Sequence, residues 1–336
     1  MRTLYLRGIL VLLALAVPPA PAHAGGVVTV CDEAHLLAAL AGGGTVTFTC
    51  SGVITLAAEI VIAADTTIDG SGQAVTISGN DAVRVFTVNS GVALDLNGLI
   101  VSHGAGFYPL KAGAIYNAGT LILSNSTFSH NRADYGGAID NDIGGTVFVS
   151  NSTFSSNHGY YGGGIHNIGT LNLTNTTFSG NDAYDGAGIL SSGGAVTVHD
   201  SAFSGNVVSG GGLGGGISIW GGSVIVSGST FSGNDAHFGG GISNSAVMTV
   251  SHSIFSSNSA SEGAAIYNGN VGAASVNNST VSGNSADDGG GIQNYGTVTV
   301  SNSTFSGNIA GNNGGGMPLS SGTGSVSNST FSGYNA

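Results

Sequence analysis

Basic residues are scarce in this 336-residue chain, which has five lysines and arginines against 17 aspartates and glutamates. Two of the five, Arg2 and Arg7, lie at the N-terminus. Residues 25–336 therefore keep three basic residues and a formal charge of 3 − 17, or −14. Nucleic acids and anionic membranes attract proteins through positive surfaces, so we expect neither as a partner.

Long hydrophobic runs are also missing. The apolar run at residues 9–17 is about half of the roughly 20 residues that a membrane-spanning helix needs. It follows Arg2 and Arg7 and precedes Ala22-His23-Ala24, which is the pattern of a secretory signal peptide. We predict that residues 1–24 are a signal peptide and that residues 25–336 form one secreted or cell-surface domain without a transmembrane anchor.

Cysteine occurs only twice, at Cys31 and Cys50. In a secreted chain such a pair favours a disulfide, which stabilises a fold by about 3 kcal/mol on the chain-entropy model. A metal or redox site needs more ligands or a C-x-x-C spacing. The two cysteines therefore predict a structural role, and we expect no metal site at this position.

What the chain does have is a repeat of about 25 residues. One marker is a phenylalanine, replaced once by valine, at positions 24 to 28 residues apart: Phe128, Phe154, Phe178, Phe203, Phe231, Phe255, Val281, Phe305 and Phe331. The other is an aliphatic residue after a glycine cluster: Ile115, Ile139, Ile165, Ile189, Ile217, Ile242, Ile266, Ile292 and Met317. Such a period indicates a stacked-repeat architecture.

Within each repeat apolar residues alternate with threonine and serine, as at Val298 and Val300, which is the pattern of β-strands. Three short strands cannot bury a core alone, but stacked coils can share one. We predict an all-β fold: a single parallel β-helix, right-handed by the preference of such connections, with three strands per coil and roughly 11 coils. Residues 100–336 hold the regular repeats.

The N-terminal end of this rod needs a cover, because an open β-helix end exposes unpaired strand edges. Asp32 and Glu33 suit a helix start, positions 36, 37 and 40 carry leucines that form an apolar face, and glycines at 42–44 suit a helix end. Residues 25–62 are therefore predicted to form an N-terminal capping helix and the first coil. At the other end we find no comparable cover. Either the chain is a fragment, or another molecule or a second copy of the protein docks end to end on the last coil.

Asparagines recur in three columns: three residues before the phenylalanine marker, as at Asn125 and Asn302, three residues after it, as at Asn181, and two after the isoleucine marker. Stacked amides can hydrogen-bond to one another and to turn backbone. We expect inward-facing ladders, and for that reason no glycosylation at Asn125 or Asn302, although both begin N-x-S/T acceptor sequences.

The paired markers F-S-x-N and G-G-(A/G)-I resemble the repeats of the polymorphic outer membrane protein family and of bacterial right-handed β-helix proteins with the pectin-lyase-like fold. Phe178-Ser179-Gly180-Asn181 and Gly136-Gly137-Ala138-Ile139 carry this resemblance, which covers about residues 100–336. It implies the β-helix. It does not select an activity, because that fold hosts lyases, hydrolases, adhesins and inert stalks.

Acidic and aromatic residues recur six and seven positions after the phenylalanine marker, in a turn before the isoleucine strand. They are Asp134, Tyr135, Tyr160, Tyr161, Tyr184, Asp185, His237, Glu262, Asp287 and Asp288. Stacking would align them along one edge, where tyrosine rings can pack on sugars and carboxylates can accept hydroxyl hydrogen bonds. Simple exposure of a turn explains the same composition, and catalysis centred on Asp287 is a third interpretation.

We favour a secreted or cell-surface structural, adhesin-like protein without catalytic activity, which binds an extracellular glycan or cell-surface component. The alternative is a polysaccharide-active enzyme of the pectate-lyase-like type, with calcium and an arginine base. Only Arg84 and Arg132 are available as arginines in residues 25–336, which disfavours the alternative. No cofactor is expected; calcium at the acidic edge is the one candidate. The histidines share no column, so His166, His199 and His252 are expected to be isolated surface residues.

Overall fold

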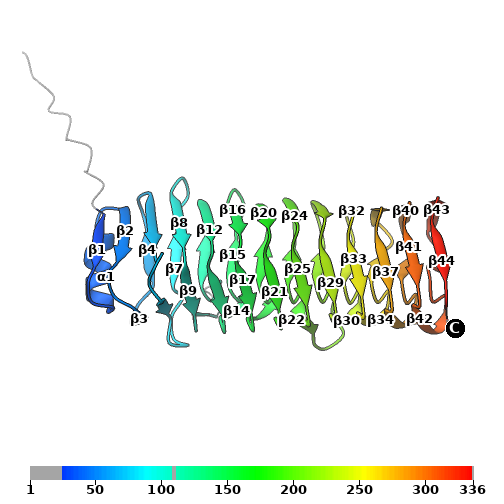
Figure 1. Ribbon diagram of the computed structural model, residues 1–336, viewed down its shortest axis with the longest axis horizontal. Helices are drawn as coiled ribbons and strands as arrows, with labels where there is room; N and C mark the ends of the chain where they lie inside the picture. Colours follow the sequence, from blue (N-terminus) through cyan, green and yellow to red (C-terminus); the bar gives the residue numbers. More distant parts are fainter. Residues whose placement is uncertain (1–24, 108–110, 335–336) are drawn as a thin grey trace, which may run out of the picture.

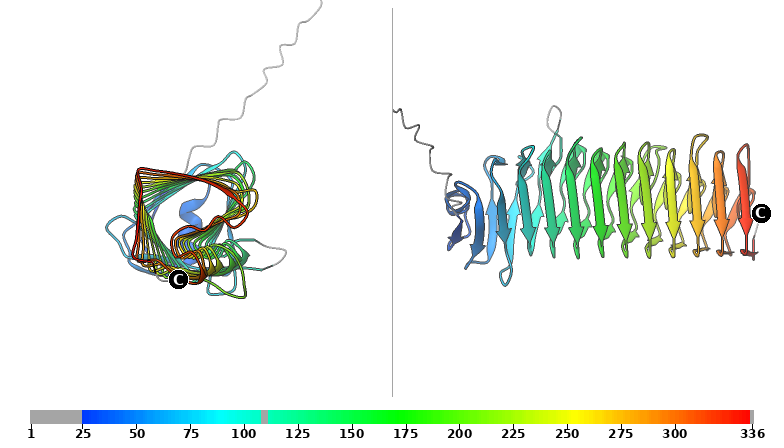
Figure 2. Two further views of the ribbon diagram at one scale, coloured as in Figure 1. Left: turned by 90° about the vertical axis from the view of Figure 1, so that its right-hand side faces the viewer. Right: turned by 90° about the horizontal axis from the view of Figure 1, so that it is seen from above.

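The chain forms a long parallel β-solenoid of about 11 turns (Figure 1). The computed structural model describes residues 25–107 and 111–334, so the expected signal peptide lies outside the described residues. Successive coils superimpose closely when the rod is viewed along its axis (Figure 2). This architecture confirms the predicted all-β parallel β-helix and is consistent with right-handed winding.

Two parallel sheets carry most of the regular repeat. Sheet A has 13 strands: β1 (Gly26–Val28), β2 (Gly44–Phe48), β5 (Thr66–Asp69), β8 (Ala93–Asn97), β12 (Thr120–Ser124), β16 (Thr146–Ser150), β20 (Thr170–Thr174), β24 (Ala195–His199), β28 (Ser223–Ser227), β32 (Val247–Ser251), β36 (Ala273–Asn277), β40 (Thr297–Ser301) and β43 (Thr323–Ser327). Sheet B has 12 strands: β3 (Gly52–Thr55), β6 (Val75–Ser78), β9 (Leu99–Ser102), β13 (Thr127–Ser129), β17 (Thr153–Ser155), β21 (Thr177–Ser179), β25 (Ala202–Ser204), β29 (Thr230–Ser232), β33 (Ile254–Ser256), β37 (Thr280–Ser282), β41 (Thr304–Ser306) and β44 (Thr330–Ser332).

Two further sheets complete each coil. Sheet C holds the isoleucine marker in 10 strands: β4 (Ile60–Ile62), β7 (Phe86–Val88), β11 (Ile115–Asn117), β15 (Ile139–Asn141), β19 (Ile165–Asn167), β23 (Ile189–Ser191), β27 (Ile217–Ile219), β31 (Ile242–Asn244), β35 (Ile266–Asn268) and β39 (Ile292–Asn294). Sheet D has nine short strands: β10 (Ala105–Gly106), β14 (Arg132–Tyr135), β18 (His158–Tyr161), β22 (Asp182–Asp185), β26 (Val207–Val208), β30 (Asp235–Phe238), β34 (Ser259–Glu262), β38 (Ser285–Asp288) and β42 (Ile309–Asn313).

Sheet D is a fourth strand per coil, beyond the three that the sequence predicted. Its strands pair in parallel, Tyr135 with Tyr161 and Tyr161 with Asp185. Their inward residue is a small one such as Ala133 or Ala183. Without a large apolar residue at alternate positions, this segment has the composition of a turn, which is why the strand pattern does not reveal it.

Phenylalanines and paired aliphatic residues fill the interior, as the repeat predicts. The rings of Phe178, Phe203 and Phe231 are fully buried and stack with centroid separations of 4.8 and 4.7 Å. Val281 interrupts this column in its coil and is also fully buried. Each fully buried ring contributes about 1.5–3 kcal/mol of transfer free energy, so the shared core holds the coils together.

Buried asparagine ladders run beside the rings. The amide oxygen of Asn206 accepts hydrogen bonds from both the backbone N–H and the side-chain amide of Asn181 (3.1 and 2.9 Å). The side-chain amide of Asn206 in turn donates to Phe178 O (3.1 Å) and to Asn234 Oδ1 (2.9 Å). The ladder therefore satisfies corner groups that the sheets leave unpaired.

One asparagine column differs from the prediction. Asn125, Asn151, Asn175, Asn278, Asn302 and Asn328 are exposed, and φ lies between 48° and 50° at all six. Asparagine tolerates this left-handed conformation better than most residues, so these positions form the corner between sheets A and B. The expectation that this column faces inward is wrong, and so is the structural reason given against glycosylation there.

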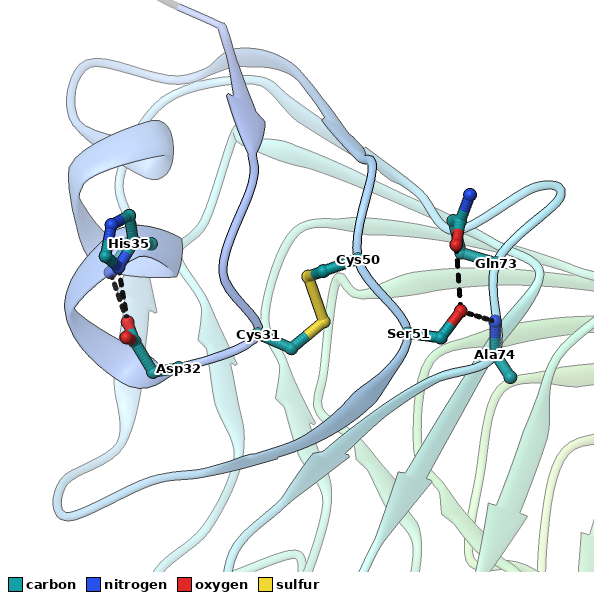
Figure 3. Close-up of a disulfide and its surroundings, with 7 residues drawn as sticks. All are labelled: Cys31, Asp32, His35, Cys50, Ser51, Gln73 and Ala74. Carbon is teal, nitrogen blue, oxygen red and sulfur yellow. Dashed lines mark hydrogen bonds and ion pairs between the residues drawn. A yellow bond between two sulfur atoms is a disulfide. The ribbon is translucent and has the colours of Figure 1, made fainter.

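The N-terminal cap forms as predicted. Helix α1 (Glu33–Leu40) begins after Asp32, whose carboxylate accepts a hydrogen bond from the His35 N–H (2.9 Å). Cys31 and Cys50 form the disulfide beside it, with their Cα atoms 5.7 Å apart (Figure 3). The predicted apolar face is partly wrong, because Leu37 is 46% exposed whereas Ala39 is buried with Leu36.

At the other end, the last described strands of sheets A and B, β43 and β44, have mostly exposed side chains. Self-association at this edge stays a prediction.

Candidate functional site

The acidic and aromatic residues singled out from the sequence lie in sheet D rather than in a turn. The column six residues after the marker is the more exposed one: Tyr160, Tyr184, His237 and Asp287 are exposed and Asp134 is half-buried. In the column at seven residues, Tyr135, Tyr161, Glu262 and Asp288 are half-buried and Asp185 is buried. The parallel register aligns them along one edge of the rod, as predicted.

This edge is divided into two parts next to β26, because Ser209 and Gly210 occupy the positions six and seven residues after Phe203 where other coils carry acidic and aromatic residues. The first part is an aromatic cluster, which we define as Tyr135, Tyr160, Tyr161, Tyr184 and Trp220. The second part is acidic and lies on β34 and β38. There Glu262 accepts a hydrogen bond from the Tyr295 hydroxyl (2.8 Å), and Asp288 accepts one from the Asn313 side chain (2.7 Å).

The aromatic cluster presents flat, mutually supported rings. Tyr160 and Tyr184 are stacked with centroids 4.9 Å apart and an interplanar angle of 3°, and both are exposed. The Tyr161 ring contacts three others, with centroid separations of 5.2 Å to Tyr135, 4.7 Å to Tyr160 and 5.3 Å to Trp220. Trp220 is 41% exposed. Trp220 lies three residues after the isoleucine marker Ile217, so it falls outside the columns that are counted from the phenylalanine marker.

Asp185 is not an exposed ligand of this edge. Its carboxylate is buried and accepts a hydrogen bond from the Leu213 N–H (2.6 Å). Burial raises the pKa of Asp185 above its ordinary 3.8, although the Leu213 N–H acts in the opposite direction. The native state therefore holds this proton more tightly than the unfolded chain does, and the resulting stability is lost as the pH rises through the folded-state pKa.

We expect Asp185→Asn to raise the melting temperature at pH 7, because the amide removes the buried charge and keeps an oxygen for the Leu213 N–H. The gain should shrink toward zero at about pH 3, where the carboxylate is protonated. Thermal unfolding followed by circular dichroism at both pH values measures it. Asp287→Asn, at an exposed position, is the matched control and should change little; equal gains in the two variants would contradict the role of burial.

A buried histidine centre, Asp140–His166–Ser192, lies on the outer face of sheet C next to the aromatic cluster. His166 Nδ1 is 2.6 Å from Asp140 Oδ1, and His166 Nε2 is 3.0 Å from Ser192 Oγ. Asp140 is fully buried and His166 is 3% exposed, whereas Ser192 is half-buried. The expectation that His166 is an isolated surface residue is therefore wrong.

Neighbouring side chains explain why outward-facing groups of sheet C are buried here. The Tyr135 ring packs against His166 with centroids 5.3 Å apart. Lys111 Nζ is 3.8 Å from Asp140 Oδ2 and 5.7 Å from the centroid of the Tyr135 ring. Tyr135 of sheet D thus covers the centre, in which the register of sheet C places Asp140 beside His166.

The repeat itself contained the information that could have found this centre. Asp140 and His166 each follow the isoleucine marker by one residue, and Ser192 follows it by three in the next coil. Aligning the histidines on the isoleucine marker places Asp140 and His166 side by side.

The described residues do not assemble the groups of a polysaccharide lyase around Asp287. Within the described ranges no group of three or more His, Cys, Asp or Glu side chains is arranged to hold a metal ion. Arg84 pairs with Glu59 (2.7 Å). Arg132 lies on β14, six strands away in sheet D from β38, which carries Asp287.

Comparisons with models of known families, with curated proteins and with solved structures found no match. Among the described residues, no helix has the length and apolar character needed to cross a membrane. The fold and the site geometry are therefore the basis for function.

Proposed function

We propose that this protein is a secreted or cell-surface β-helix rod that binds extracellular glycans through the aromatic cluster. The observation that supports it is the exposed, parallel pair of Tyr160 and Tyr184 with Trp220 on the next coils. Rigid aromatic faces pack on sugar rings and lose little conformational entropy on binding. The charge of −14 on residues 25–336 favours neutral or basic glycans over polyanionic ones.

The rod geometry suits an adhesin-like role, because stacked coils hold the cluster on sheet strands whose positions are fixed by the core. Within the cluster, the Tyr161 ring contacts the rings of both Tyr135 and Trp220. A surface that is already ordered needs little rearrangement to bind. The calcium-dependent lyase remains the alternative, without a local arginine near Asp287 to support it.

A glycan array probed with residues 25–336, with and without calcium, tests this function. Trp220→Ala should weaken binding by about tenfold or more, because a buried aromatic contact contributes at least about 1.5 kcal/mol. Phe148→Ala, which removes an exposed ring from sheet A, is the matched control and should leave binding unchanged. Absence of binding to every glycan would overturn the proposal, and calcium-dependent release of unsaturated sugars would favour the lyase.

A further inference from the structure

The three members of the buried histidine centre form one hydrogen-bonded chain across three successive coils. The distances of 2.6 Å from Asp140 to His166 and 3.0 Å from His166 to Ser192 fall within the range of about 2.6–3.2 Å that an activated nucleophile requires. A carboxylate orients an imidazole, and the second imidazole nitrogen faces a hydroxyl. This arrangement recurs on unrelated folds and is defined by its geometry.

Burial fixes the roles of the two nitrogens. Asp140 is fully buried beside His166, so an Nδ1–H donated to this carboxylate sets the tautomer and leaves Nε2 as the acceptor of the Ser192 hydroxyl proton. Only the serine end of the chain is open to solvent, since Ser192 is half-buried. A substrate can therefore reach the hydroxyl while water is kept from the carboxylate.

A second Asp–His–Ser set shows what the same residues look like without this burial. His199 Nδ1 is 2.8 Å from Ser227 Oγ, and His199 Nε2 is 3.0 Å from Asp200 Oδ2. The side chains of His199 and Asp200 are 53% and 58% exposed. Water competes for those hydrogen bonds and screens the charge, so Ser227 is the natural control for Ser192.

We propose that Ser192 and His166, positioned by Asp140, form a centre that hydrolyses carboxylic esters. The peptide N–H that follows Ser192, on Gly193, donates to no other residue of the described ranges, and the N–H after a nucleophile is a common donor to the oxyanion. This inference revises the expectation of a protein without catalytic activity.

The reaction balances with water as the only co-reactant. Ser192 Oγ attacks the acyl carbon while His166 Nε2 takes its proton; the oxyanion then collapses, and the alcohol leaves with the proton from His166. Water next attacks the acyl-serine and gives its proton to His166. Collapse breaks the Ser192 ester bond, releases the carboxylic acid and returns the proton to Ser192. Asp140 orients the ring throughout.

The neighbouring surface indicates the substrate class, and this part rests on the proposed function. The backbone N–H of Trp220 donates to the backbone carbonyl of Ser191 (2.8 Å). Trp220 of the aromatic cluster therefore lies in the coil next to that of Ser192. The Tyr135 ring covers His166 on the other side. A glycan bound at the cluster would place an O-acyl group, such as an acetyl ester on a sugar hydroxyl, near Ser192.

Labelling with a fluorophosphonate probe and hydrolysis of 4-nitrophenyl acetate test the centre without any glycan. We expect labelling of Ser192 in peptide mass spectra and a loss of at least about 100-fold in hydrolysis in Ser192→Ala and His166→Gln. Ser227→Ala should keep both the labelling of Ser192 and the hydrolysis of 4-nitrophenyl acetate. Asp140→Asn should lower kcat with little change in KM, as a positioning role requires.

Several outcomes separate the centre from glycan binding. Absence of a label on Ser192, or equal losses in Ser192→Ala and Ser227→Ala, would overturn the hydrolytic centre even if the array shows binding. Labelling and hydrolysis without glycan binding would retain the centre and remove the acylated glycan as substrate. Asp140 and His166 are buried, so variants at these positions can fail to fold. Ser192 is half-buried, so we expect Ser192→Ala to fold as the parent does, and circular dichroism verifies this.

Discussion

Phe203→Ala is expected to destabilise the rod by about 3–5 kcal/mol, the usual cost of removing a fully buried phenylalanine from a core. The ring is fully buried and lies between those of Phe178 and Phe231, each within 4.8 Å and nearly parallel to it. Neighbouring coils cannot collapse into the gap, because their backbones are fixed by sheet hydrogen bonds on all sides. Denaturant unfolding followed by circular dichroism measures the loss.

Phe148 provides the matched control for this experiment. It lies on β16 of sheet A and is 45% exposed, and its replacement by alanine should change stability by no more than about 0.5 kcal/mol. Phe203→Val should cost less than Phe203→Ala, since Val281 occupies the same column in another coil. Similar losses for Phe148→Ala and Phe203→Ala would show that the stacked column does not carry the stability.

Asn206→Ala is expected to cost at least about 3 kcal/mol, although the alanine fits without a clash. The change leaves the N–H groups of Asn181 without the amide oxygen of residue 206, and it removes donors from Phe178 O and Asn234 Oδ1. Each buried polar group that loses its partner costs about 1–3 kcal/mol, and these costs are not additive. Thermal unfolding at neutral pH measures the change in stability.

Asn172→Ala tests whether the ladder or the residue type matters. Asn172 lies on β20 and faces outward and is half-buried, and its side chain makes no hydrogen bond to another residue in the described part of the chain. Its replacement should alter stability by about 0.5 kcal/mol or less. If both asparagine variants lost the same small amount, the ladder would have no special energetic role.

The sequence predicted the parts of the fold that depend on periodic side chains. Phe203, the asparagine column that includes Asn206, and the Cys31–Cys50 pair all behave as their spacing implies. Each of these predictions needs only the distance between coils, because a parallel register places equivalent residues over one another. The fold class therefore followed from composition and period.

The candidate site could be predicted less completely, because it depends on how one strand packs against the next within a coil. The repeat spacing predicted that Tyr160 and Tyr184 are aligned. It did not predict how the columns six and seven residues after the phenylalanine marker pack against sheet C. Whether His166 is buried depends on the fold of sheet D over sheet C, which brings Tyr135 onto the imidazole. The repeat period does not specify how sheet D packs over sheet C. The contact between Trp220 and Tyr161 depends on packing within the coil as well, so the period does not predict it either.

The irregular members of the columns have a consequence for how the chain finds its registration during folding. Because the repeats are nearly equivalent, a coil can stack on the wrong neighbour while the repeat between them is left outside the solenoid as a loop. Such an arrangement loses few contacts. Three residues break the columns: Val281 replaces a phenylalanine, and Ser191 and Ile219 replace asparagines. Because of them, a mispaired order of coils differs in energy from the native one. These exceptions mark individual coils and favour the one order in which every partner matches.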